Sequence, residues 1–195
     1  MLLLHLGAAE STQFKNCRSS LVYGSYTPLA NAHLQPEHAI NRRYYWETPS
    51  IKEKYPNMLS ISQALIAQMV AHSRKDHPDE ACGVIAGPAG SDQPTRFIPM
   101  INSARSPTFY EFDSADLLKL YRELDANDED PVVIYHSHTA TEAYPSRTDV
   151  AYASEPFAHY VLISTRETGN QDGPYEIRSY RFVDGEITEE EISIN

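Results

Sequence analysis

The sequence has few basic residues, few cysteines and no long apolar run, and each shortage excludes a class of protein. Its 195 residues carry 16 Lys and Arg against 27 Asp and Glu, a formal charge of −11, so no dense basic face exists for nucleic-acid phosphates. No apolar run approaches the roughly 18 residues that span a bilayer, and no glycine-rich phosphate loop is present. Cys17 and Cys82 lack Cys-x-x-Cys spacing, which disfavours a disulfide scaffold. We therefore expect a cytoplasmic protein that binds neither nucleic acid nor membrane.

The first 57 residues differ in character from the rest. They hold six basic residues against four acidic ones, whereas 58–195 hold ten against 23. They also contain the single tryptophan, Trp46, and show no sustained period of 2 or 3.6 residues. Three interpretations stay open for 1–57: a disordered leader, a partner-binding arm with aromatic anchors, or translated upstream sequence before a start at Met58. In each case we predict an irregular or disordered extension whose deletion leaves folding and activity intact.

From Met58 onward, helical and extended patterns alternate along the chain. The predicted strands cover 59–61, 81–86, 96–101, 109–112, 132–135, 160–165, 175–182 and 186–192, with a hairpin turn at Asp184-Gly185. The predicted helices are one capped by Ser62 and ending near Asp76, one over 115–125 capped by Ser114, and a short one from Ser146. This order predicts one α/β domain over 58–195, with a β-sheet packed between helices.

The stretch from His136 to Asp149 carries the chemistry. His136 and His138 follow an apolar strand at i and i+2, so both imidazoles point to the same face. Asp149 falls in the first turn of the following helix, from which its carboxylate can reach the end of that strand. Two imidazoles and one carboxylate form a three-ligand zinc set that leaves the fourth tetrahedral position open. The pattern therefore predicts a catalytic site with one Zn²⁺ per chain.

Simpler interpretations compete with the metal site. A His-x-His pair alone is more often hydrogen-bonded than metal-bound, and Ser146 with Asp149 also fits a helix cap followed by an acidic residue. The combination His-x-His-x7-Ser-x2-Asp, however, is expected by chance in only about 2 of 1000 sequences of this composition, which favours the metal. Cys82 lies in an apolar strand and is interpreted as a core residue, not a nucleophile. His159, just before a predicted strand, is a candidate to hydrogen-bond to one of the metal-binding side chains without binding the metal itself.

These residues resemble the motif of the JAMM (MPN+) zinc metallopeptidase family, in which an upstream Glu precedes His-x-His-x7-Ser-x2-Asp. The segment Glu80-Ala81-Cys82-Gly83 is similar to the family's Glu-x-Cys-Gly. The resemblance covers 58–195 and none of 1–57, and it is strongest to the bacterial sulfur-carrier–cysteine hydrolases (CysO-cysteine peptidase type). One departure is Thr139, where many members have proline.

The resemblance implies a single MPN domain with a mixed β-sheet, and it implies a role for each motif residue. His136, His138 and Asp149 would bind zinc, and Glu80 would be the general acid and base. Ser146 would stabilise the oxyanion. Without the resemblance, Glu80 is an ordinary acidic loop residue.

The resemblance also implies a substrate. Members cut beside the C-terminal Gly-Gly of a ubiquitin-like protein, and only seven residues separate His138 from Ser146, with no long insertion to hold a second modifier. We therefore expect a ubiquitin-like sulfur-carrier protein as partner and release of cysteine, in cysteine biosynthesis, as the reaction. The alternatives are an isopeptidase that removes ubiquitin-like modifiers from lysine and a non-catalytic MPN binding scaffold. A homodimer is left open.

Overall fold

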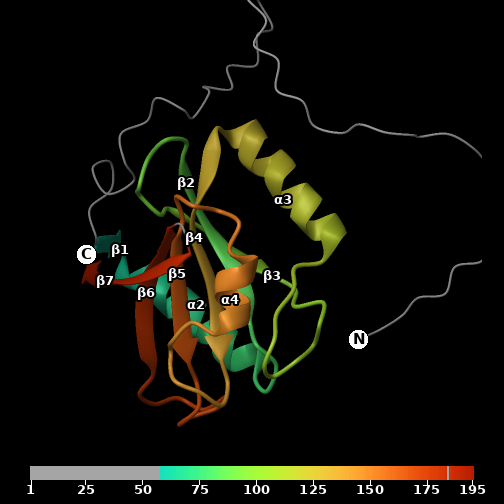
Figure 1. Cartoon of the computed structure of the whole chain (residues 1–195), viewed down its shortest axis with the longest axis vertical. Helices are drawn as coiled ribbons and strands as arrows, with labels where there is room; N and C mark the ends of the chain where they lie inside the picture. Colours follow the sequence, from blue (N-terminus) through green and yellow to red (C-terminus); the bar gives the residue numbers. More distant parts are fainter. Residues whose placement is uncertain (1–57, 184) are drawn as a thin grey trace, which may run out of the picture. The chain divides into compact units, whose positions relative to one another are not determined.

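The computed structural model describes residues 58–183 and 185–195, so the predictions for 1–57 and for Asp184 lie outside the described part. Seven strands form one sheet in the order β1-β7-β6-β5-β4-β2-β3 (Figure 1). The strands are β1 (Met58–Ile61), β2 (Cys82–Pro88), β3 (Arg96–Met100), β4 (Glu129–His138), β5 (His159–Ser164), β6 (Glu176–Val183) and β7 (Glu186–Ile194). The β4–β5 and β1–β7 pairs are parallel and the other pairs antiparallel, so the predicted mixed sheet is confirmed.

Three helices of the described part pack on the two faces of this sheet. They are α2 (Gln63–Asp76), α3 (Ser114–Asn127) and α4 (Arg147–Tyr152). In Figure 1, α4 lies in front of the strands and α2 behind them. None of the described helices is both long and apolar enough to cross a membrane.

The alternation of side chains along β4 decides which face carries the predicted site. Val133 and Tyr135 pack in the core layer under α2, with Met69 of that helix. Ile134 points the other way, into the layer that contains Leu120 of α3. Because successive strand residues alternate between faces, the even-numbered histidines that end β4 share the α3 face.

Two helix caps predicted from the sequence are confirmed. The Ser62 Oγ accepts a hydrogen bond from the Leu65 N–H at 3.3 Å at the start of α2, and Ser146 caps α4. The cap predicted for α3 is wrong by one residue. Asp113, and not Ser114, accepts the N–H groups of Ala115 and Asp116 there, because a carboxylate one position earlier meets the same free amides.

The predicted strand over 109–112 is also wrong. Only an isolated bridge joins Asn102 to Phe112. The Glu111 N–H donates instead to the Asn102 side chain, at 3.2 Å. A side chain that takes up a backbone N–H in this way competes with a strand ladder, so the segment stays a loop.

Candidate metal centre

Strand β4 and helix α4 bring the three predicted ligands together. The Nε2 atoms of His136 and His138 lie 3.2 Å apart. Asp149 places Oδ1 3.3 Å from the Nε2 of His136 and Oδ2 3.5 Å from the Nε2 of His138. One donor atom from each residue lies within 4.8 Å of the other two. All three donor atoms can therefore meet on one small ion.

The second ring nitrogen of His138 orients its imidazole. Its Nδ1 lies 2.8 Å from the carbonyl oxygen of Glu142 and 3.0 Å from the Oγ1 of Thr141. A carbonyl only accepts, so Nδ1 carries a proton, and Nε2 is the ring nitrogen that faces Asp149 and would bind a metal after losing its own proton. A hydrogen bond of this kind on the far nitrogen is typical of histidines that bind metals.

The charges of the cluster also suit a cation. Burial lowers the pKa of His136, which favours the neutral imidazole that binds metal. Burial acts to raise the pKa of Asp149, but hydrogen bonds with the two histidines outweigh it and hold that pKa well below its usual range. For His138, burial acts to lower the pKa while hydrogen bonds with Asp149 and Glu142 raise it, so this histidine would release a proton when a metal binds.

Glu80 is buried on the same side, between α2 and β2, although it is a charged residue. Its N–H donates to the carbonyl of Ser106 at 2.9 Å, and its own carbonyl accepts from the Asn102 Nδ2 at 2.9 Å. Burial raises the pKa of Glu80 to about 7; the charge of His138 opposes this rise and that of Asp149 adds to it. A carboxyl with a pKa near neutrality can both take and give a proton at physiological pH.

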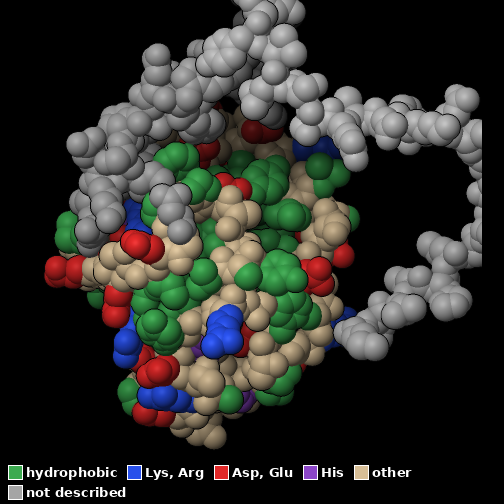
Figure 2. All heavy atoms as spheres, viewed as in Figure 1, with side chains coloured by type: hydrophobic (Ala, Val, Ile, Leu, Met, Phe, Trp, Pro, Cys, Tyr) green, Lys and Arg blue, Asp and Glu red, His purple; other side chains and the backbone are tan. Residues whose placement is uncertain are grey.

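A groove beside helix α4 includes one of the predicted ligands, Asp149, in its lining. Its volume is about 320 Å³, and Asp149 and Thr148 belong to its lining. Six of its 17 lining residues are aromatic and come from the segment 109–112, α3, α4 and β5: Phe109, Tyr110, Phe112, Tyr121, Tyr152 and Tyr160. Figure 2 shows apolar side chains gathered on the surface between α3 and α4.

The sequence did not reveal the residues that surround the predicted ligands. The Tyr110 ring stacks on His136 with centroids 4.5 Å apart and an interplanar angle of 26°. The hydroxyl of Thr139 donates to the carbonyl of Pro107 at 2.9 Å, so the departure from proline at this position supplies a contact. The side chain of Asn102 donates a hydrogen bond to the carbonyl of Glu80, although the two residues are 22 positions apart in the sequence. Its one sequence signal is its place between a strand and the turn-rich 103–107.

The sequence interpretation of Cys82 is confirmed. Cys82 is fully buried, and burial raises its pKa to about 12, as expected for a core residue and not for a nucleophile. Ser137 points to the opposite face from the histidines that flank it. Its Oγ accepts the N–H of Ala81 at 2.8 Å.

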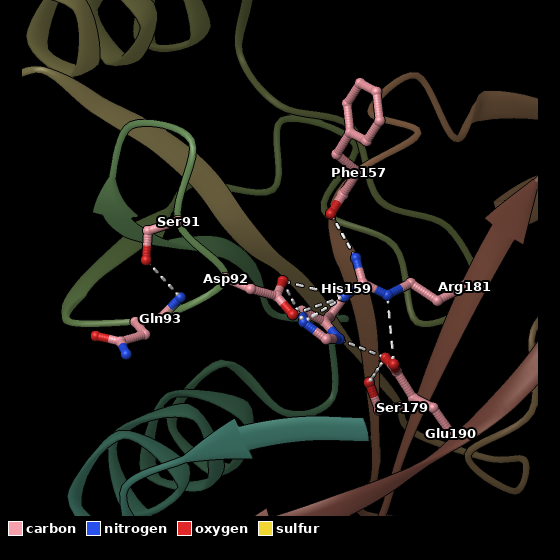
Figure 3. Close-up of polar contacts among 8 residues, drawn as sticks. All are labelled: Ser91, Asp92, Gln93, Phe157, His159, Ser179, Arg181 and Glu190. Carbon is pink, nitrogen blue, oxygen red and sulfur yellow. Dashed lines mark hydrogen bonds and ion pairs between the residues drawn. The ribbon is translucent and has the colours of Figure 1, made fainter. Parts of the chain in front are cut away.

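Within the described residues, His159 makes no hydrogen bond with the predicted metal ligands, contrary to the sequence interpretation. It shares the α2 face of the sheet with Val161 and joins a separate buried polar network (Figure 3). Its Nδ1 lies 2.5 Å from Oε1 of Glu190, and its Nε2 lies 2.9 Å from Oδ1 of Asp92. Arg181 donates to both carboxylates. The network ties the loop that carries Asp92 to strands β5, β6 and β7.

Comparison with known proteins identifies the family. Residues 62–183 match the family described as prokaryotic homologs of the JAB domain. The chain is also 61% identical over 137 residues to the CysO-cysteine peptidase of Mycobacterium tuberculosis, covering 70% of this chain and 91% of that protein. The chain belongs to the JAB domain family.

Two more distantly related proteins also match the chain. The desampylase of Haloferax volcanii is 32% identical over 111 residues, which cover 54% of this chain and 80% of that protein. A solution structure of a protein from Desulfitobacterium hafniense superposes with a TM-score of 0.60 at 28% identity, covering 71% of this chain and 92% of that one. The family resemblance and the JAB/MPN fold are therefore confirmed.

Proposed function

We propose that this JAB domain is a zinc-dependent peptidase that acts on a ubiquitin-like sulfur-carrier protein. It hydrolyses the bond after the carrier's C-terminal Gly-Gly and releases cysteine, a reaction of cysteine biosynthesis. The observation that carries the proposal is the convergence of His136, His138 and Asp149 beside the buried Glu80. The 61% identity to a CysO-cysteine peptidase supports the substrate class.

The three converging side chains would hold one zinc ion. The donor set fits zinc, because the Nε2 atoms of both histidines and the carboxylate of Asp149 face one another across a short distance. The ring of His138 is also held in place through its other nitrogen, Nδ1. When bound, zinc supplies a Lewis acid that lowers the pKa of water toward about 7 and polarises the scissile carbonyl.

Two further residues would move protons and stabilise charge. Glu80 would take a proton from the attacking water as oxygen adds to the carbonyl carbon. It would then give this proton to the departing amine as the C–N bond breaks. The Ser146 Oγ accepts the Asp149 N–H at 3.2 Å, so its own proton stays available to donate to the oxyanion.

The groove beside Asp149 would receive the carrier's tail. Glycine residues let a backbone approach the cluster closely, because no Cβ intervenes. The aromatic wall excludes water from an extended peptide that lies along it. A short tail with a single cysteine as leaving group needs no further binding site.

Intact-mass spectrometry of a carrier that bears a C-terminal cysteine tests the proposal. The adduct is incubated with the full chain in the presence of zinc, with a chelator, or with the Glu80→Gln variant. Glu186→Gln is the matched control, because Glu186 is an exposed carboxylate at the start of β7. We expect loss of one cysteine mass in the zinc and Glu186→Gln arms only.

An unchanged adduct in the zinc arm, with a folded and zinc-loaded protein, would overturn the proposed substrate. The same enzyme would then be offered a carrier linked to lysine. Cleavage of that conjugate would establish the isopeptidase activity instead.

A further inference from the structure

Asn102 lies just after β3, and its buried side chain uses all of its hydrogen-bonding capacity. The Nδ2 donates to the carbonyl oxygens of Glu80, at 2.9 Å, and Phe109, at 3.0 Å. The Oδ1 accepts the N–H groups of Ala104, at 3.0 Å, and Glu111, at 3.2 Å. One side chain thus closes the loop over residues 103–111, here called the site loop, and binds it to Glu80.

The site loop holds Glu80 from the other side as well. The carbonyl of Ser106 accepts the Glu80 N–H at 2.9 Å. The carbonyl of Pro107 accepts the hydroxyl of Thr139, which directly follows the predicted ligand strand. The backbone of Glu80 is therefore fixed at both its N–H and its carbonyl, each time through Asn102 or the loop that Asn102 folds.

The carboxylate of Glu80 has no comparable anchor. It makes no hydrogen bond with another side chain or backbone group within 58–183 or 185–195. Its place relative to His136 and Asp149 thus depends on where the backbone of Glu80 lies. A shift of that backbone would carry the carboxylate with it.

We propose that Asn102 is a positioning residue for the reaction: it fixes the peptide of Glu80, and so the carboxylate, at the distance that proton transfer requires. The proposal rests on the proposed role of Glu80. It adds a residue that touches neither the substrate nor the predicted ligands. Misplacement of a catalytic group by about 1 Å can lower the rate about 100-fold.

Asn102→Asp separates the two sides of this side chain. An aspartate keeps an oxygen for the N–H groups of Ala104 and Glu111, but it replaces the donor that faces the Glu80 carbonyl with an acceptor. Asn102→Ser is a second variant, uncharged and smaller. Its hydroxyl can still close the turn to Ala104 but is too short to reach Glu80. The matched control is Ser103→Ala, which removes a hydroxyl that donates to the Glu111 carbonyl in the same loop.

The experiment measures three properties of the full-length variants. These are kcat and KM on the carrier–cysteine adduct, zinc content, and hydrogen exchange of backbone amides by NMR. For both Asn102 variants we expect kcat to fall about 10–100-fold, with KM and zinc content as in the wild type. The Glu80 amide should exchange faster while the Ala104 amide stays protected. Ser103→Ala should match the wild type.

Unchanged kcat, or an unchanged Glu80 amide in both Asn102 variants, would overturn the proposal. So would loss of zinc in step with kcat, because that result would mark Asn102 as a general support of the fold. If the wild type fails to release cysteine, the proposed substrate is wrong. The exchange of the Glu80 amide then still decides whether Asn102 holds Glu80.

Discussion

Ser146 and Asp149 hydrogen-bond to each other in both directions at the start of α4. The Ser146 N–H donates to Oδ2 of Asp149 at 2.6 Å, and the Asp149 N–H donates to the Ser146 Oγ at 3.2 Å. The same carboxylate faces the Nε2 atoms of His136 and His138. The helix cap and the metal ligand, two competing interpretations of the sequence, are therefore compatible, and the cap orients the carboxylate for the cluster.

This relationship predicts two separable effects of Ser146→Ala. The variant loses an oxyanion donor, so kcat should fall about 10²–10³-fold. It also loses a helix cap, so the free energy of unfolding should fall by about 1 kcal/mol. Ser62→Ala is the control, since it removes the equivalent cap of α2 away from the site. It should lose similar stability and keep wild-type kcat; full activity of Ser146→Ala would contradict the proposed role.

The pKa of Glu80 predicts a pH-dependent stability for the metal-free protein. Because burial raises this pKa to about 7, the folded state binds the proton more tightly than the unfolded chain. Ionisation therefore costs stability, with no penalty below about 4.5 and the full penalty above about 7. The difference in the free energy of unfolding between Glu80→Gln and the wild type should therefore grow by about 2 kcal/mol, in favour of the variant, as pH rises from about 5 to about 8. This value is discounted for solvent screening. Urea unfolding of both proteins at several pH values, with chelator present, measures this difference. A difference that does not change with pH would contradict the raised pKa of Glu80.

The His159 network also predicts a stability that falls as pH rises. Burial acts to lower the pKa of His159, but hydrogen bonds with Asp92 and Glu190 outweigh it and raise the pKa above 6.5. The stabilisation is therefore complete below 6.5 and is lost as pH rises through the folded pKa. His159→Gln should lose about 3 kcal/mol near pH 6 and less at higher pH, because it breaks a buried ion pair. Denaturant unfolding measures this loss. Zinc content should not change, and its loss would show that the network supports the site.

The chain over 58–195 is proposed to be the complete catalytic domain. The matched family region, 62–183, lies within it. Deleting residues 1–57 should therefore leave the melting temperature and the rate of cysteine release unchanged. Thermal unfolding and the mass assay check this on the truncated protein. An insoluble or inactive product would show that the extension contributes to the fold or to the substrate site.

Local patterns predicted much of the fold and of the candidate site. The apolar stretch before His136 and the cap at Ser146 are properties of neighbouring residues, so the sequence placed both elements correctly. The predicted ligands follow from them, because a strand and the helix after it leave few ways to bring His136, His138 and Asp149 together.

Contacts between distant segments could not be predicted in this way. Glu80 follows Pro78 and Asp79 and has the pattern of an exposed loop, yet hydrogen bonds with Ser106 and Asn102 bury it. The same side chain of Asn102 takes the N–H of Glu111 and removes the strand predicted over 109–112. Both failures involve the buried side-chain amide of Asn102, whose partner Glu80 lies 22 residues away in the sequence.

The metal content of the purified full chain tests the central claim most directly. Elemental mass spectrometry would be applied to the wild type and to His136→Ala, Asp149→Ala and Glu80→Gln. We predict about one zinc per chain in the wild type and in Glu80→Gln, and a loss of most of it in the two ligand variants. Activity should follow zinc on chelation and return. Zinc retained by His136→Ala and Asp149→Ala, or full activity of a metal-free wild type, would contradict the account.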